Sequence, residues 1–164
     1  MVSVTTPLYA APTGPYGGVP FLENSYVETP AAPWKEGGVV VPSYPQDQDL
    51  VSIALPSRDT LKLYVDPKSF LRTVDGVVHI TLAVESPAGA RSVYYDGMRC
   101  GVSQYKTYAV GTPDHKFSPV RNSKWQAIPT PAVNAFRDYL YKEYLCDGSP
   151  STAGTPEEFA KAIK

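Results

Sequence analysis

The stretch SFLRTVDGVVHITLAV, residues 69–84, decides the fold because it predicts a β-hairpin. Two runs rich in strand-forming residues, 69–74 and 77–84, flank the pair Asp75-Gly76. An Asp-Gly pair suits a type I′ turn, in which both central residues have positive φ. Side chains alternate along the second run, so every other residue shares one face, which we predict to be the core face. These residues are Val78, Ile80, Leu82 and Val84.

Apolar runs on either side of the hairpin predict further strands of one antiparallel sheet with about five strands. They span residues 49–55, 61–65, 91–98 and 102–110. A polar loop then runs from Gly111 to about Pro129, and loops of this length are commonly functional or mobile.

One long C-terminal helix is predicted after this loop. Thr130-Pro131 suits an N-cap followed by proline at the first helical position, and Gly148 with Pro150 ends the pattern. Apolar residues at spacings of three and four form a single stripe, which we expect to pack on one face of the sheet. The stripe comprises Val133, Phe136, Leu140 and Tyr144. Strands followed by one helix indicate the α+β class.

Three regions follow from the composition. Residues 1–33 are rich in proline and glycine and predict a flexible, disordered N-terminal segment, which is either an inert tail or an extended spacer. Residues 34–147 form the α+β domain. Residues 148–164 predict a flexible tail in which Thr155–Glu158 suits a capping box opening a short helix.

Charge and hydropathy exclude two classes of partner. The net charge of −1 gives no long-range attraction to nucleic acid, and we expect none to bind. No apolar stretch approaches the roughly 20 residues of a membrane-spanning helix, so we predict no transmembrane segment.

The two cysteines leave two interpretations. In a cytosolic protein they would be unrelated buried thiols, whereas an exported protein would pair them. Cys100 ends a predicted strand and Cys146 follows the predicted helix, so a bond between them would tie the helix to the sheet. For a loop of this length the chain-entropy model gives about 4 kcal/mol of stabilisation. We therefore expect one disulfide and an oxidising compartment.

No catalytic or metal-binding constellation is evident. His79 lies within a predicted strand and His115 in an exposed loop, and no nucleophile-elbow motif surrounds a serine. The alternative to a non-enzymatic protein is a weak or unrecognised hydrolase that uses His115 or His79. The cysteines and histidines form no close ligand pairs, and no phosphate-binding glycine motif occurs, so we predict no metal and no cofactor.

One local bias marks a candidate binding surface. Between Arg91 and Lys124 there are six basic and two acidic residues, an excess of four positive charges, interleaved with aromatic residues. Such residues on a sheet can bind a protein or an anionic polymer, although strands also favour tyrosine for reasons of packing alone. The candidate residues are Tyr94, Tyr95, Arg99, Tyr105, Lys106, Arg121, Lys124 and Trp125.

Several short motifs, in order, resemble the cryptic neisserial protein-like family of Gram-negative envelope proteins, over residues 34–147. The resemblance is carried by Trp34-Lys35-Glu36, Tyr44-Pro45-Gln46-Asp47, Asp75-Gly76-Val77-Val78, Ser86–Arg91, Arg99-Cys100, Tyr105-Lys106, Trp125 and Tyr139–Cys146. It implies an exported, single-domain protein without an assigned activity.

These observations lead to one functional expectation. We expect an exported, non-enzymatic binding or structural module, in the periplasm or associated with the outer membrane, whose partner is an envelope protein or polymer. We expect a monomer. If the protein lies on the cell surface, we expect host antibodies to contact its loops.

Overall fold

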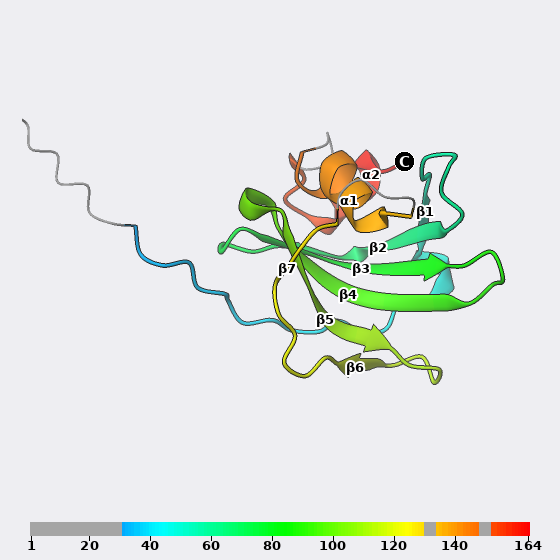
Figure 1. The fold of residues 1–164 in the computed structure, drawn as a ribbon, viewed down its shortest axis with the longest axis horizontal. Coiled ribbons are helices and arrows are strands. Elements are labelled where there is room, and N and C mark those ends of the chain that lie inside the picture. The colour runs from blue at the N-terminus through cyan, green and yellow to red at the C-terminus, as the bar shows by residue number, and fades with distance from the viewer. Residues whose placement is uncertain (1–30, 130–133, 148–151) are drawn as a thin grey trace, which may run out of the picture. The chain divides into compact units, whose positions relative to one another are not determined.

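A seven-stranded antiparallel sheet forms the centre of the molecule (Figure 1). The computed structural model describes residues 31–129, 134–147 and 152–164, and Trp34–Lys164 form one compact unit. Strands β1 to β6 lie side by side in sequence order, and β7 pairs with β5. The strands are β1 (Val51–Ile53), β2 (Lys62–Arg72), β3 (Val77–Glu85), β4 (Arg91–Arg99), β5 (Gln104–Gly111), β6 (Phe117–Pro119) and β7 (Gln126–Ala127). The antiparallel sheet is confirmed, with β6 and β7 formed inside the predicted polar loop.

The predicted hairpin is present as β2 and β3, but its turn is not type I′. Within the turn Thr73–Gly76 only Gly76 has a positive φ, of 82°. Asp75 instead uses its carboxylate as an acceptor for the Thr73 hydroxyl and the Val77 amide. The Asp-Gly pair therefore predicted the place of the turn correctly and its type wrongly.

Strand β2 joins two runs that the sequence separates at Asp66-Pro67. The pairing with β3 is irregular between Asp66 and Leu71, where a β-bulge accommodates the proline. Ser69 restores the missing ladder contact with its side chain, because its Oγ accepts from the Thr81 amide at 2.7 Å. A hydroxyl thus takes the place of a backbone carbonyl, and the strand continues.

The long C-terminal helix is not present. Helix α1 spans Phe136–Leu140 and a π-helical turn, η3, spans Tyr141–Leu145. The predicted N-cap at Thr130-Pro131 and the predicted stops at Gly148 and Pro150 lie outside the described residues. Among the described helices, none is long and apolar enough to cross a membrane.

Asn134 explains why α1 begins late. Its φ is 63°, in the left-handed region, which a right-handed helix cannot include. The Asn134 amide donates to the Asp59 carboxylate at 2.9 Å, and its side-chain oxygen accepts from the Thr60 amide at 2.9 Å. This contact with the β1–β2 loop holds the chain out of helical conformation until Ala135.

The π-helical turn changes which side chains face the sheet. The Cys146 amide donates to the Tyr141 carbonyl at 2.9 Å, five residues back, so the helical phase shifts. Tyr141 and Leu145 are buried with Leu140, whereas Tyr144 of the predicted stripe is only partly buried. Val133 lies outside the described residues.

The predicted disulfide is confirmed. Cys100 and Cys146 are bonded, with an S–S distance of 2.06 Å. The bond joins the end of β4 to the end of η3, and beside it the Tyr141 hydroxyl donates to the Cys100 carbonyl. The helical segment is thus fixed to the sheet at its C-terminal end.

A buried ion pair fixes the other end of the helical segment. The Arg137 Nε lies 2.8 Å from the Asp96 carboxylate of β4, which is fully buried. The guanidinium also packs 5.0 Å from the Tyr94 ring centroid and 4.5 Å from that of Tyr105. Burial raises the pKa of Asp96, and the Arg137 charge opposes this shift.

The main core lies between the sheet and the helices, as predicted. Val78, Ile80, Leu82 and Val84 all belong to it. Helix α2 (Pro156–Ala162) packs on β2, where the Phe159 ring stacks on Phe70 with 4.4 Å between ring centroids.

The C-terminal residues differ from the predicted flexible tail. Residues 152–164 are described, and the predicted capping contact is present, since Thr155 Oγ1 accepts from the Glu158 amide at 3.2 Å. The Glu158 carboxylate in turn accepts from the Gly154 amide at 2.7 Å. The short helix therefore forms, and burial of Phe159 ties it to the domain. The flexible N-terminal segment lies outside the described residues except for residues 31–33.

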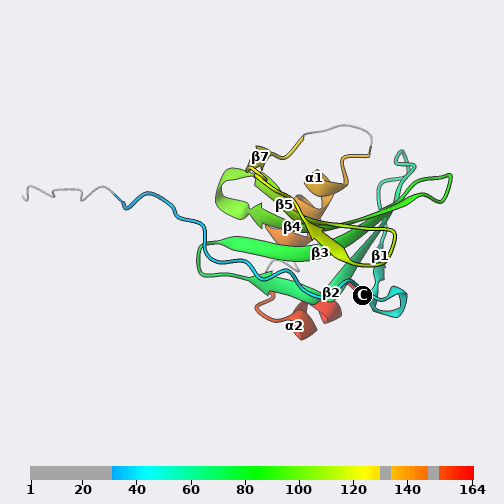
Figure 2. The same cartoon turned by 90° about the horizontal axis from the view of Figure 1, so that it is seen from below.

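The opposite face of the sheet is covered by an extended segment, residues 34–45, which we call the strap (Figures 1 and 2). Two glycines let aromatic rings approach the sheet closely. A Cβ at Gly111 would lie 2.8 Å from the Tyr44 ring, and a Cβ at Gly97 would lie 2.7 Å from the Tyr108 ring. Both faces of β3 are therefore buried, including His79 and Thr81, which point away from the helices.

Replacing Phe159 tests whether the C-terminal helix is part of the domain. Phe159→Ala removes a fully buried ring, and we expect the free energy of unfolding to fall by about 3–5 kcal/mol. Urea unfolding measures this. The matched control is Lys161→Ala on the exposed side of the same helix, which should change the free energy by less than about 0.5 kcal/mol. Equal stabilities of the two variants would contradict the packing of α2.

Candidate functional site

Glu36 is the polar contact that holds the strap to the sheet. Its carboxylate accepts from Lys106 Nζ at 2.9 and 3.0 Å, from the Tyr108 hydroxyl at 2.8 Å and from Trp125 Nε1 at 3.2 Å. Burial alone would raise the pKa of Glu36, but these hydrogen bonds outweigh it and hold the pKa below its ordinary value. One carboxylate therefore joins the strap to β5 and to the β6–β7 loop.

A second anchor lies at the β2–β3 turn. Trp34 Nε1 donates to the Asp75 carbonyl at 2.7 Å, and the Gly37 amide donates to the Asp75 carboxylate at 2.7 Å. Burial would raise the pKa of Asp75, yet hydrogen bonds from Thr73, Gly37 and Val77 hold it low. The turn that Asp75 shapes thus also positions the first residue of the strap.

Trp34, Arg99 and Trp125 meet at this anchor and form what we call the Trp34–Arg99–Trp125 cluster. The Arg99 guanidinium lies 3.6 Å from the Trp34 ring centroid and 5.6 Å from that of Trp125. The two indole rings meet edge to face at 5.8 Å. Trp34 keeps 40% of its surface exposed. Such a cation–π contact is worth about 0.5–2 kcal/mol, depending on how far the cation is desolvated.

The cation of the cluster, Arg99, has no ion-pair partner among the described residues, although the Glu36 carboxylate contacts Trp125. Arg99 donates to the Gln104 side-chain oxygen at 3.0 Å, which is a neutral acceptor. Within the described part of the chain, no carboxylate forms an ion pair with Arg99, Arg121 or Lys124. Lys106, in contrast, is paired with Glu36 at 2.9 Å. The accessible charge of the cluster is therefore that of Arg99, with Lys124 one residue before Trp125.

The eight residues of the candidate binding surface do not form one surface. Tyr94 and Tyr105 lie on the helix side of the sheet, against Arg137. Tyr95 is buried on the strap side, where burial raises its pKa to about 12. Three residues come together in or beside the cluster, and two are exposed in the β6–β7 loop. The three are Arg99, Lys106 and Trp125, and the two are Arg121 and Lys124.

The sequence prediction missed two residues of the site, Trp34 and Glu36. Each is more than 60 residues away from Arg99 and Lys106 along the chain, so no local spacing connects them. The sequence did offer one signal. Trp34 opens the folded region, Glu36 follows two residues later, and the strands carry an excess of basic residues with which a carboxylate could pair. Polar and basic residues on the second face of a strand predict a solvated face, so alternation alone does not indicate the strap that covers it.

The two histidines have different surroundings, one buried in the sheet and one in an exposed turn. His79 is 2% exposed and packs against the rings of Tyr95 and Tyr108, with centroids at 5.9 and 5.3 Å, and its Nε2 lies 3.5 Å from Thr73 Oγ1. Burial lowers its pKa, and its Nδ1 has no hydrogen-bond partner among the described residues. His115 stacks on Tyr44 at 5.5 Å in an exposed turn. Among the described residues, no serine or cysteine hydrogen-bonds to either histidine.

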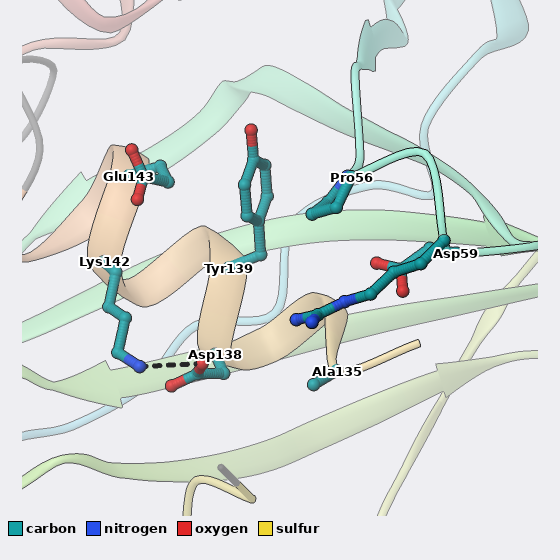
Figure 3. A pocket seen from close by; sticks show the side chains of 8 residues that line it. Pro56, Asp59, Ala135, Asp138, Tyr139, Lys142 and Glu143 are labelled. Carbon is teal, nitrogen blue, oxygen red and sulfur yellow. Dashed lines mark hydrogen bonds and ion pairs between the residues drawn. The ribbon is translucent and has the colours of Figure 1, made fainter. Parts of the chain in front are cut away.

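Two hollows in the surface of the described residues are lined by ion-paired side chains. One lies between the β1–β2 loop and α1 and holds about 60 Å³, space for a few water molecules (Figure 3). There Lys142 pairs with Asp138 at 2.9 Å. The other hollow lies beside Tyr44 and His115, where Arg91 pairs with Asp47 at 2.6 Å. Among the described residues, no group of three or more histidine, cysteine or acidic side chains could hold a metal ion.

Comparison with known proteins gives one match. The model of a family described as the CNP1-like family matches residues 29–164. The match includes the C-terminal helix and begins before Trp34, so it is longer than the resemblance seen in the sequence motifs. No curated protein matches the chain, and no solved structure matches it.

Glu36→Gln tests the anchor of the strap. The pKa of Glu36 is lower in the folded protein than its ordinary value of 4.5, so its stabilisation is complete above that value and is lost as the pH falls through the folded pKa. At pH 7 we expect Glu36→Gln to lower the free energy of unfolding by about 1–2 kcal/mol, because a charged acceptor is lost. Below the folded pKa the difference from the wild-type protein should vanish.

Urea unfolding at several pH values measures the effect of this substitution. Glu143→Gln is the matched control, since Glu143 is exposed on the helical segment and is remote from the strap. A deficit of Glu36→Gln that is the same at low and neutral pH would contradict the charged contact.

Proposed function

This chain belongs to the CNP1-like family, and we propose that it is an exported envelope protein that binds a partner through the Trp34–Arg99–Trp125 cluster and catalyses no reaction. The proposal places it in the periplasm or at the outer membrane. The partner is an envelope protein or polymer. The observation that carries the proposal is the exposed Trp34 ring stacked on an arginine without a carboxylate partner.

The disulfide supports the compartment. Bonds such as Cys100–Cys146 form and persist in oxidising spaces, including the bacterial periplasm, and are rare in a reducing cytosol. Both cysteines of the chain are used in this bond.

The residue types of the cluster support binding. Tryptophan and arginine are enriched among the residues that contribute most to protein interfaces. Arg99 is held in one position by the Trp34 ring and by Gln104, so little side-chain entropy would be lost when a partner binds. A bound carboxylate or phosphate would supply the missing counter-charge.

The surroundings of the histidines support a non-enzymatic role. A general base must reach both its nucleophile and solvent-borne substrate. His79 is enclosed by Tyr95, Tyr108 and the strap, and His115 lies in a turn beside the ring of Tyr44. Among the described residues, His79 Nε2 contacts the Thr73 hydroxyl at 3.5 Å, but that hydroxyl donates to the Asp75 carboxylate, and no serine or cysteine hydrogen-bonds to either histidine.

Crosslinking in cells tests the binding surface. A photoreactive amino acid at Lys35, beside Trp34, should form an adduct with an envelope component. Arg99→Glu should lower the yield at least tenfold, because it places a negative charge where the partner's anionic group would bind. Arg58→Glu, an exposed arginine of the β1–β2 loop, is the matched control and should leave the yield unchanged.

The same probe at Lys161 on α2 should give no specific adduct. Adducts at Lys35 that are equally strong with and without Arg99→Glu would contradict the assignment of the surface. Retention of the disulfide and of the unfolding midpoint confirms that the variants are folded.

A further inference from the structure

Exposed apolar side chains concentrate at one end of the sheet. Val74 lies in the β2–β3 turn and is fully exposed, and Val102 lies in η2 (Cys100–Val102) and is 52% exposed. Leu71, near the same turn, is 50% exposed. With Trp34 these are four of the six large exposed apolar residues of the described chain, the others being Val40 and Val120.

The two turns lie side by side. Val77 at the start of β3 pairs with Arg99 at the end of β4, so the β2–β3 turn and the β4–β5 connection leave the sheet at the same end. Figures 1 and 2 both show them at the left. The centres of the two turns are separated by two inter-strand distances within the sheet. The turns therefore lie roughly 10 Å apart. We call this part of the molecule the hairpin end.

Three basic side chains lie beside these apolar side chains, at an end of the sheet that also carries acidic residues, including Asp147, which follows the disulfide-bonded Cys146. Arg99 lies at the base of the β4–β5 connection and has no carboxylate partner among the described residues, and Lys35 and Lys124 are exposed next to Trp34 and Trp125. The one acidic residue of the β2–β3 turn is Asp75. Its carboxylate is directed at Thr73, Gly37 and Val77 and holds the strap.

We propose that the hairpin end docks on an anionic phospholipid surface, with Val74 and Val102 entering the boundary of the acyl chains. Tryptophan favours the headgroup level of a membrane, where its ring is half buried and its N–H is satisfied. Arg99, Lys35 and Lys124 then bind lipid phosphates. The proposal goes beyond the proposed function by naming a membrane as the partner, and it shares with that function only the Trp34–Arg99–Trp125 cluster.

The exposure of the two turn residues suits a lipid surface. Residues that dominate protein interfaces fill pockets or are surrounded by packed neighbours. Val74 and Val102 instead lie in two neighbouring turns, where Val74 is fully exposed and Val102 is 52% exposed. Separate apolar tips beside a tryptophan and cations match the layered polarity of a membrane interface.

Vesicle binding tests the proposal with the full oxidised chain. Vesicles of phosphatidylglycerol and phosphatidylethanolamine should sediment the protein, and vesicles of phosphatidylcholine should not. Both tryptophans of the chain lie at the hairpin end, so their combined emission should shift to the blue on the anionic vesicles. Added salt should weaken the binding, because the lipid charge is screened.

Substitutions at the tips distinguish insertion from charge attraction alone. Val74→Asp combined with Val102→Asp should lower the partition coefficient at least tenfold. Val40→Asp is the matched control, since Val40 is 85% exposed in the strap, outside the hairpin end, and it should leave the coefficient unchanged.

Three results would overturn the proposal: no sedimentation of the wild-type protein, no blue shift, or equal partition of the tip variant and the Val40 control. Crosslinking from Lys35 to a protein that persists while vesicle binding is absent would overturn the membrane inference alone. Arg99→Glu could also leave both the vesicle binding and the Lys35 crosslinks unchanged. That result would contradict a role of the Trp34–Arg99–Trp125 cluster in binding and hence the proposed function.

Discussion

The bond between Cys100 and Cys146 is the constraint on which the rest of the fold depends. The helical segment that it holds has ten residues, and a helix of that length does not persist alone in water. Its first turn is fixed by Arg137 on the buried Asp96, and its last turn is fixed by the disulfide. A buried ion pair adds little net stability once desolvation is counted, and therefore acts mainly to position the helix. The covalent bond stabilises the arrangement by restricting the unfolded chain.

The sheet is buried on both faces by covers of different kinds. The helices supply an apolar core on one face, whereas the strap contributes polar anchors at Glu36 and Asp75 on the other. This difference explains why β3 carries His79 and Thr81 in buried positions among apolar residues. It also places an arginine and two tryptophans at the sheet end where the strap begins, so the fold itself assembles the candidate site.

Several features of the fold that depend on residues close together in the sequence were predicted correctly. The hairpin, its core face and the C-terminal capping contact are examples, whereas the disulfide joins residues 46 apart and was predicted from the number and positions of the cysteines. Two predictions that failed were the single long helix and the single binding surface. Asn134 is held in left-handed conformation by the β1–β2 loop, and a π-helical turn shifts the helical phase, so a stripe with a period of 3.6 residues predicted too long a helix. The candidate surface was divided because strand alternation places Tyr94 and Tyr95 on opposite faces.

The most direct test of this account is the oxidation state of the two cysteines in living cells that carry the native protein. Rapid acid quenching, alkylation of free thiols and intact-mass measurement would report it. We expect no alkylated cysteine without prior reduction, and two after reduction. Two alkylated cysteines in the unreduced sample would contradict the account, because the bond that fixes the helix to the sheet would then be absent in the protein's own compartment.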